Sequence, residues 1–212
     1  MTTQHHDHDH GHPHPTRPDH DDRPVTYHQR LESAIRELLI EKGIVTPAEI
    51  TRAIERMDAR TPAQGARIVA KAWSDPAYKQ RLLAKASEAI AELGIEPGAF
   101  NLIVVENTER VHNLVVCTLC SCYPRAILGL PPDWYKSRSY RSRAVSEPRA
   151  VLAEFGTVIP DDVEVRVHDS TADMRYLVLP KRPQGTGNWP EARLAEIVTR
   201  DTMIGVKVAE AG

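Results

Sequence analysis

All three cysteines of this 212-residue chain lie within six positions, as Cys117, Cys120 and Cys122 in the stretch VCTLCSC. An odd number of closely spaced cysteines cannot form the paired disulfide framework of a small secreted domain. In a reducing compartment such a cluster is more typical of metal binding or redox chemistry. The fold must therefore hold one short, sulfur-rich loop in a defined shape, without cysteines from elsewhere in the chain.

Charge and hydropathy exclude several classes of partner. The formal net charge is −2 at pH 7, so the chain lacks the basic excess that is typical of nucleic-acid binding. No apolar run is long enough to span a membrane, and the first residues lack the apolar segment of a secretory signal. We expect a cytoplasmic protein with no nucleic-acid or membrane partner, built from one catalytic domain and its appendages.

Residues 1–26 form a segment rich in histidine and aspartate. It holds seven of the ten histidines and almost no apolar side chains. Such a composition cannot offset the entropy of ordering, so we predict a disordered arm. The arm either captures divalent metal weakly or is a solubilising tail or cloning remnant, and its composition leaves both open.

Residues 27–96 are predicted to be helical. Apolar residues recur from Leu31 to Leu39 at the spacing of one helix face, and Gly43 is placed to end that helix. Three further helix starts are predicted where Thr or Asp precedes Pro, at positions 46–47, 61–62 and 75–76. The last of these helices is expected to run to about residue 93.

Residues 97–212 are predicted to form an α+β domain. Four β-branched runs predict strands, and two amphipathic segments at 147–156 and 189–200 predict helices. The expected strands cover residues 100–108, 112–119, 163–169 and 174–180, with the last two forming a pair. The fold class is therefore α+β, with an N-terminal helical arm followed by a mixed, layered α/β domain.

The cysteine spacing does not fit the commonest metal and redox sites. Structural zinc sites usually combine two separated ligand pairs, and only His112 and His168 lie beyond the first 28 residues. A Cys3His zinc site with one of them stays open, although no paired spacing supports it. The C-x2-C-x-C spacing does not match the usual iron–sulfur motifs. A redox C-x-x-C pair would leave Cys122 without a role.

Another interpretation is that the loop itself chelates a single ion. In Cys120-Ser121-Cys122, two thiolates and the intervening backbone nitrogens are close enough to bind one ion, with Cys117 as a third sulfur. Thiolates and deprotonated amides are strong anionic donors, which favour trivalent cobalt or iron over zinc. Such a site leaves one coordination position open for water or substrate.

The stretch VCTLCSCYP, followed by LGLPPDWYKS, closely resembles the metal-binding loop of the nitrile hydratase α subunit. The resemblance extends from about Thr61 through VVENTERVHNL, DDVEVRVHDS, MRYLVLPKRPQGT and VTRDTMIGV. It implies that Cys117, Cys120 and Cys122 bind the metal through sulfur, and that the amides of Ser121 and Cys122 bind it through nitrogen. It also implies oxidation of Cys120 to a sulfinic acid and of Cys122 to a sulfenic acid.

The resemblance further implies the metal and the reaction. Thr118 and Tyr123 match the cobalt-type pattern, so we expect one Co(III) per α subunit rather than Fe(III). The implied reaction is hydration of a nitrile to its amide, with Cys120, Ser121 and Cys122 as catalytic residues. Either metal-activated water or the Cys122 sulfenate attacks the nitrile carbon. The Ser121 hydroxyl either helps at the open position or is simply small enough for the backbone to wrap the ion.

The family resemblance also implies partners. In the family, two arginines of a β subunit compensate the charge of the oxidised sulfurs, so this chain should be inactive without a β subunit, in an expected α2β2 assembly. A metal-loading activator protein is a further expected partner. Trp134 and Tyr135 are expected to pack the pocket wall or core. We assign the chain's own nearby arginines to solvent or to the subunit interface: Arg125, Arg138, Arg141 and Arg143.

Two alternatives remain beside nitrile hydratase. The γ subunit of thiocyanate hydrolase uses a similar loop and also hydrates a C≡N group. Pro124-Arg125 after Cys122-Tyr123 favours this alternative, whereas GLPPDWYK favours nitrile hydratase. Many nitrile hydratases have Trp-Pro where this chain has Arg125-Ala126, a difference that bears on substrate preference. The second alternative is a non-catalytic metal or redox-sensing module, which would hold labile zinc or a reversible disulfide.

Overall fold

The computed structural model describes residues 25–211 and divides the chain into two compact units, residues 1–52 and 53–212. Most of the predicted histidine-rich arm lies outside the described residues. The boundary between the units falls inside a helix. The three-part division predicted from the sequence, with a helical segment ending at residue 96, stays a prediction.

The first unit contains the helix α1 (Tyr27–Glu41) and the start of α2 (Pro47–Asp58). Both helices begin where the sequence predicts. At the start of α1, the Thr26 hydroxyl accepts a hydrogen bond from the Gln29 amide, and the Gln29 side chain accepts one from the Thr26 amide. This reciprocal pair satisfies two backbone N–H groups that have no partner inside the helix. Neither α1 nor α2 contains a buried residue.

The second unit opens with three helices, α3 (Pro62–Ser74), α4 (Pro76–Ala84) and α5 (Ala86–Ala91). The single helix predicted from 76 to about 93 is wrong, because the backbone leaves helical geometry at Lys85, with φ −146° and ψ 72°. Leu82 in α4 and Ile90 in α5 are both completely buried. The apolar pattern therefore continues across the break, which explains why periodicity alone did not reveal it.

The four predicted strands are present as β1 (Asn101–Glu106), β2 (Val111–Val116), β3 (Glu164–Asp169) and β4 (Met174–Leu179). They form two parallel pairs, β1 with β4 and β2 with β3. The expectation that the last two strands pair with each other is wrong. Only a short turn separates β3 from β4, but each of them finds its hydrogen-bonding partner in an earlier strand.

The remaining helices lie after β2 and after β4. Between β2 and β3 come α6 (Arg125–Leu128), α7 (Asp133–Lys136), α8 (Arg138–Ser146) and α9 (Pro148–Glu154), of which only α9 was predicted. After β4 come α10 (Glu191–Glu196) and α11 (Arg200–Ile204), where one helix over 189–200 was predicted. The unpredicted helices have four to nine residues, too short for a clear periodic pattern.

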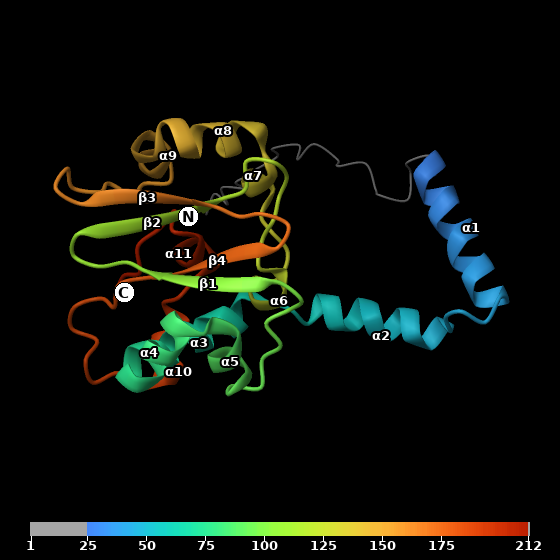
Figure 1. Cartoon of the computed structure of the whole chain (residues 1–212), viewed down its shortest axis with the longest axis horizontal. Coiled ribbons are helices and arrows are strands. Elements are labelled where there is room, and N and C mark those ends of the chain that lie inside the picture. Colours follow the sequence, from blue (N-terminus) through green and yellow to red (C-terminus); the bar gives the residue numbers. More distant parts are fainter. Residues whose placement is uncertain (1–24, 212) are drawn as a thin grey trace, which may run out of the picture. The chain divides into compact units, whose positions relative to one another are not determined.

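The second unit is layered, which confirms the predicted α+β class. In Figure 1 the strands lie between α8 and α9 on one side and α3, α4, α5 and α10 on the other. Apolar side chains from all these layers form one core, and those fully buried include Ile68, Leu82, Leu114, Leu152 and Leu177. Among the described residues, no helix is both long enough and apolar enough to cross a membrane.

Candidate metal centre

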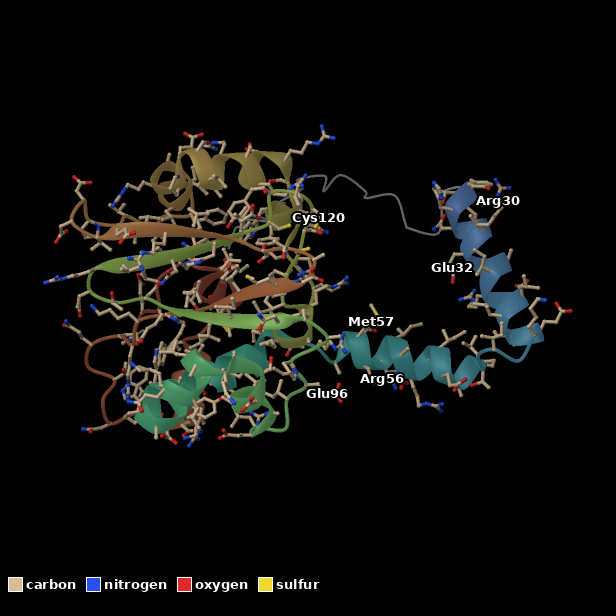
Figure 2. All side chains as sticks on the ribbon, in the orientation of Figure 1. Arg30, Glu32, Arg56, Met57, Glu96 and Cys120 are labelled. Atoms are coloured by element: carbon tan, nitrogen blue, oxygen red, sulfur yellow. The ribbon has the colours of Figure 1, made fainter. Side chains whose placement is uncertain are left out.

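The three cysteines lie in the loop that directly follows β2. Because β2 and β3 are parallel, their carboxyl ends meet at one edge, where Val116 is opposite Asp169. Val116 and Cys117 are completely buried, so the loop starts from a fixed point in the core. Figure 2 shows Cys120 at this edge of the second unit. Ligand sites are common outside the carboxyl ends of parallel strands.

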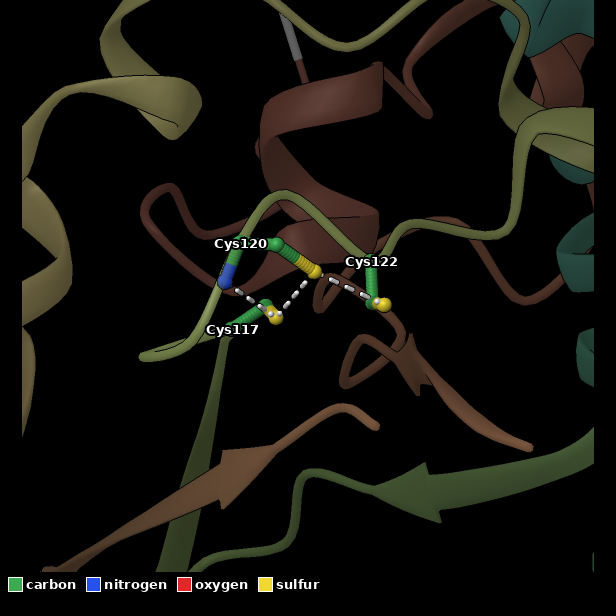
Figure 3. A group of neighbouring side chains, drawn as sticks. All are labelled: Cys117, Cys120 and Cys122. Atoms are coloured by element: carbon green, nitrogen blue, oxygen red, sulfur yellow. Dashed lines mark hydrogen bonds between the residues drawn. The ribbon is translucent and has the colours of Figure 1, made fainter. Parts of the chain in front are cut away.

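The three sulfur atoms converge. The Sγ atoms of Cys117 and Cys120 are 3.4 Å apart, those of Cys120 and Cys122 are 3.1 Å apart, and all three lie within 4.8 Å of one another. Figure 3 shows these side chains pointing to one side of the loop, where the Cys120 amide also donates to the Cys117 sulfur at 3.3 Å. Cys117 is buried, Cys122 half-buried and Cys120 exposed. One ion at their centre would meet three sulfur donors from six residues.

The protonation of the cluster is uneven. Hydrogen bonds from Cys122 and Cys117, together with the Ser121 and Cys122 amides, lower the pKa of Cys120 to about 7. Burial and the bond to Cys120 raise the pKa of Cys122 to about 12. Three converging sulfur donors fit a single thiophilic ion.

Asp169, at the end of β3, is hydrogen-bonded to the beginning of the loop. Its two carboxylate oxygens accept hydrogen bonds from the Thr118 amide at 2.9 Å and from the Thr118 hydroxyl at 2.6 Å. Arg141, on α8, donates to the Thr118 carbonyl at 3.3 Å. The peptide groups on both sides of Thr118 are thus bonded to other elements of the fold.

Two buried tyrosines hold the ends of the segment that contains the loop. The Tyr135 hydroxyl, from α7, donates to the Cys122 carbonyl at 2.9 Å, and the Tyr140 hydroxyl, from α8, donates to the Val115 carbonyl at 2.7 Å. Burial raises the pKa of both tyrosines, so their hydroxyls stay protonated and able to donate. The sequence predicted Tyr135 as a packing residue, and the structure adds this hydrogen bond.

The arginines near the loop have different surroundings. Arg143 forms ion pairs with Glu147 and Glu154 on the surface, at 2.6 and 2.5 Å, in keeping with its assignment to solvent. Arg125 and Arg138 are exposed, whereas Arg141 contacts the loop directly and departs from the expectation.

Sequence reasoning predicted no role for Arg175. Its positive charge favours the Cys122 thiolate and so opposes the rise of the Cys122 pKa. It lies near the start of β4, some fifty residues beyond the loop in the chain. It is half-buried and stacks over Phe100, with 5.2 Å from the guanidinium carbon to the ring centre. No local sequence signal could have placed this cation at the cysteines, because only the fold brings β4 to this edge.

Comparison with known families decides the classification. Residues 26–207 match the family model described as nitrile hydratase, alpha chain. This chain belongs to that family. The match starts just before α1 and ends after α11, so it includes every described helix and strand.

Individual relatives agree with this family. A low-molecular weight cobalt-containing nitrile hydratase subunit alpha from Rhodococcus rhodochrous is 51% identical over 183 residues, 82% of this chain and 86% of the relative. The thiocyanate hydrolase subunit gamma of Thiobacillus thioparus is 46% identical over 194 residues, 86% of this chain and 80% of the relative.

Solved structures show the same fold. A recombinant thiocyanate hydrolase with partially modified cobalt centres has a TM-score of 0.83 and 44% identity, over 89% of this chain and 93% of that one. A double mutant of the Fe-type nitrile hydratase of Comamonas testosteroni Ni1 has a TM-score of 0.79 and 44% identity, over 87% of this chain and 90% of that one. The shared fold therefore occurs with either metal and with either of the two enzymes.

Proposed function

We propose that this chain is the α subunit of a cobalt-type nitrile hydratase, which adds water across the C≡N bond of a nitrile to give an amide. The convergence of three sulfur atoms within 4.8 Å of one another, from a loop of six residues, carries the proposal. Membership of the nitrile hydratase alpha chain family supports it. The cobalt-containing relative and the match of Thr118 and Tyr123 to the cobalt-type pattern favour Co(III) over Fe(III).

The proposed ligands are the sulfurs of Cys117, Cys120 and Cys122 and the backbone nitrogens of Ser121 and Cys122. When bound, the cobalt ion supplies Lewis acidity that makes the nitrile carbon electrophilic. The family resemblance implies that Cys120 is the sulfinic acid, and Cys120 is also the exposed cysteine of the three, which favours its oxidation. Cys122, half-buried, is the proposed sulfenic acid, and the buried Cys117 stays a thiolate.

The loop residues then act directly on the substrate. The Cys122 sulfenate would present an anionic oxygen that either attacks the nitrile carbon or accepts a proton from the attacking water. The Ser121 hydroxyl lies in the same loop, available to hydrogen-bond substrate, or else Ser121 serves only as a small residue. The Cys120 sulfinate, with Cys122, adds negative charge that needs a cationic partner once water is excluded.

A β subunit is the proposed source of that partner. Leu119, between the first two cysteines, is 84% exposed, and Leu130 beyond the loop is 58% exposed. Apolar side chains beside a charged site are well suited to be covered by a second chain that also excludes water. The proposed assembly is α2β2 in the cytoplasm, active only with the β subunit, and an activator protein that loads the metal is a further proposed partner.

Thiocyanate hydrolase is the second candidate function. Its γ subunit is 46% identical, and its solved structure matches as well as that of a nitrile hydratase. The exposed Arg125, where many nitrile hydratases have Trp, also favours it. The higher identity to the cobalt nitrile hydratase and the GLPPDWYK stretch favour the first candidate. A non-catalytic redox module is the remaining alternative.

One set of measurements separates these candidates. The chain should be purified together with its β subunit, and its cobalt, iron and zinc contents and intact mass determined. We expect about one cobalt per chain and three added oxygens on the loop peptide, two on Cys120 and one on Cys122. An organic nitrile should give amide. Carbonyl sulfide and ammonia from thiocyanate would establish the second function, and labile zinc without added oxygen would establish the redox module.

A further inference from the structure

The cysteine loop does not hold its own shape. Residues 117–122 belong to no helix or strand, and within the loop the Cys120 amide makes its hydrogen bond to a cysteine sulfur, which becomes a ligand when metal binds. Three sulfurs can be brought together by such a segment only if something else fixes its ends. The hydrogen bonds from neighbouring elements to the loop backbone therefore identify the residues that fix its ends.

At the first cysteine, the fixing group is the Asp169 carboxylate. The Asp169 carboxylate accepts a hydrogen bond from the Thr118 amide, which belongs to the peptide group immediately after Cys117. The second bond, from the Thr118 hydroxyl at 2.6 Å, makes the contact bidentate and fixes the orientation of the residue. Because Asp169 ends β3 opposite Val116, its position is set by the β2–β3 ladder.

At the last cysteine, the fixing group is the Tyr135 hydroxyl. The carbonyl to which it donates belongs to the peptide group immediately after Cys122. Tyr135 is completely buried, and its ring contacts Tyr123 and Tyr140 at centroid distances of 5.2 and 5.7 Å. A ring packed in this way cannot move without disturbing the core, so the hydroxyl is a rigid reference point.

We propose that Asp169 and Tyr135 are positioning residues that set the distance between the first and last sulfur ligands and so prepare the loop for metal. The inference rests on the proposed metal-binding function and goes beyond it, since neither residue is a ligand. Each acts on the peptide group that follows a terminal cysteine of the loop. The metal then binds a loop that is already shaped, instead of ordering a flexible one. Partners of this kind typically change metal affinity 10- to 100-fold.

The test is a titration of the full-length, reduced chain with Co(II) under anaerobic conditions. Binding is followed by the thiolate-to-cobalt charge-transfer absorption, which reports on the cysteines and not on histidine-rich residues 1–26. The variants are Tyr135→Phe, which removes only the hydroxyl, and Asp169→Asn, which removes the charge. We expect each to raise the Kd about tenfold and to shift the absorption band, because the sulfur geometry changes.

Matched controls separate positioning from general stability. Tyr78→Phe removes another buried hydroxyl, in α4, and Asp161→Asn neutralises an exposed carboxyl before β3. Both should keep the Kd within about twofold of wild type. Unchanged Kd and band in Tyr135→Phe and Asp169→Asn would overturn the proposal, as would an equal effect in the controls. If the wild-type chain itself shows no thiolate–cobalt band, the proposed metal function fails instead.

Discussion

The three cysteines differ in surroundings although they are neighbours in sequence. Cys117 continues the buried end of β2, whereas Cys120 and Cys122 lie progressively further along a loop that reaches the surface. The sequence predicted which residues would gather, because the spacing itself makes chelation feasible. It could not predict the contacts of Asp169 and Arg141 with the loop, since these residues reach it only through strand pairing and helix packing.

At this scale, Cys117→Ser should strongly weaken metal binding while preserving the fold. A hydroxyl has nearly the same size as a thiol, but it is not a soft anionic donor at neutral pH. We expect the cobalt content of the purified complex to fall at least about tenfold, measured by elemental analysis. The thermal unfolding midpoint of the metal-free variant should match that of metal-free wild type. Cobalt retained at the wild-type level would show that Cys117 is not a ligand.

Elements marked by strong local signals were predictable from the sequence. The helices α2, α3 and α4 begin at the Thr-Pro and Asp-Pro pairs, and the β-branched runs form strands. Strand partners were not predictable, because β1 pairs with a strand about seventy residues later and β2 with one about fifty residues later. Such pairing depends on packing throughout the core, so the sequence of a strand alone does not indicate its partner. The break at Lys85 was missed for a related reason, since the buried face continues across it.

The helix starts allow a matched pair of stability measurements. Asp75 caps α4, and its carboxylate accepts a hydrogen bond from the Tyr78 amide at 3.0 Å. Thr61 occupies the same position before α3, but its side chain makes no capping bond. Asp75→Ala should therefore lower the free energy of unfolding by about 1 kcal/mol, and Thr61→Ala by clearly less. Urea unfolding monitored by circular dichroism measures both, and equal losses would mean that the capping bond contributes nothing.

Across the whole molecule, the parts that form the candidate site belong to one unit. The loop, Asp169, Tyr135 and Arg175 all lie in residues 53–212, as do the three tryptophans. The first unit contributes helices whose apolar residues remain exposed, among them Leu31, Ile35 and Leu38 at 42–48%. Helices without a buried face gain little stability from packing. Folding and metal binding should therefore both reside in the second unit.

Deletion of residues 1–52 tests this separation. Because α1 and α2 bury no side chain, the free energy of unfolding of the remaining chain should stay within about 0.5 kcal/mol of the full-length value. The tryptophans at 73, 134 and 189 report unfolding of the second unit directly, in urea, by fluorescence. The Co(II) titration should give the same thiolate band and a Kd within about twofold, since every contact to the loop described above is retained. A loss of stability above about 1 kcal/mol, or a weakened thiolate band, would show instead that the helical arm supports the metal-binding unit.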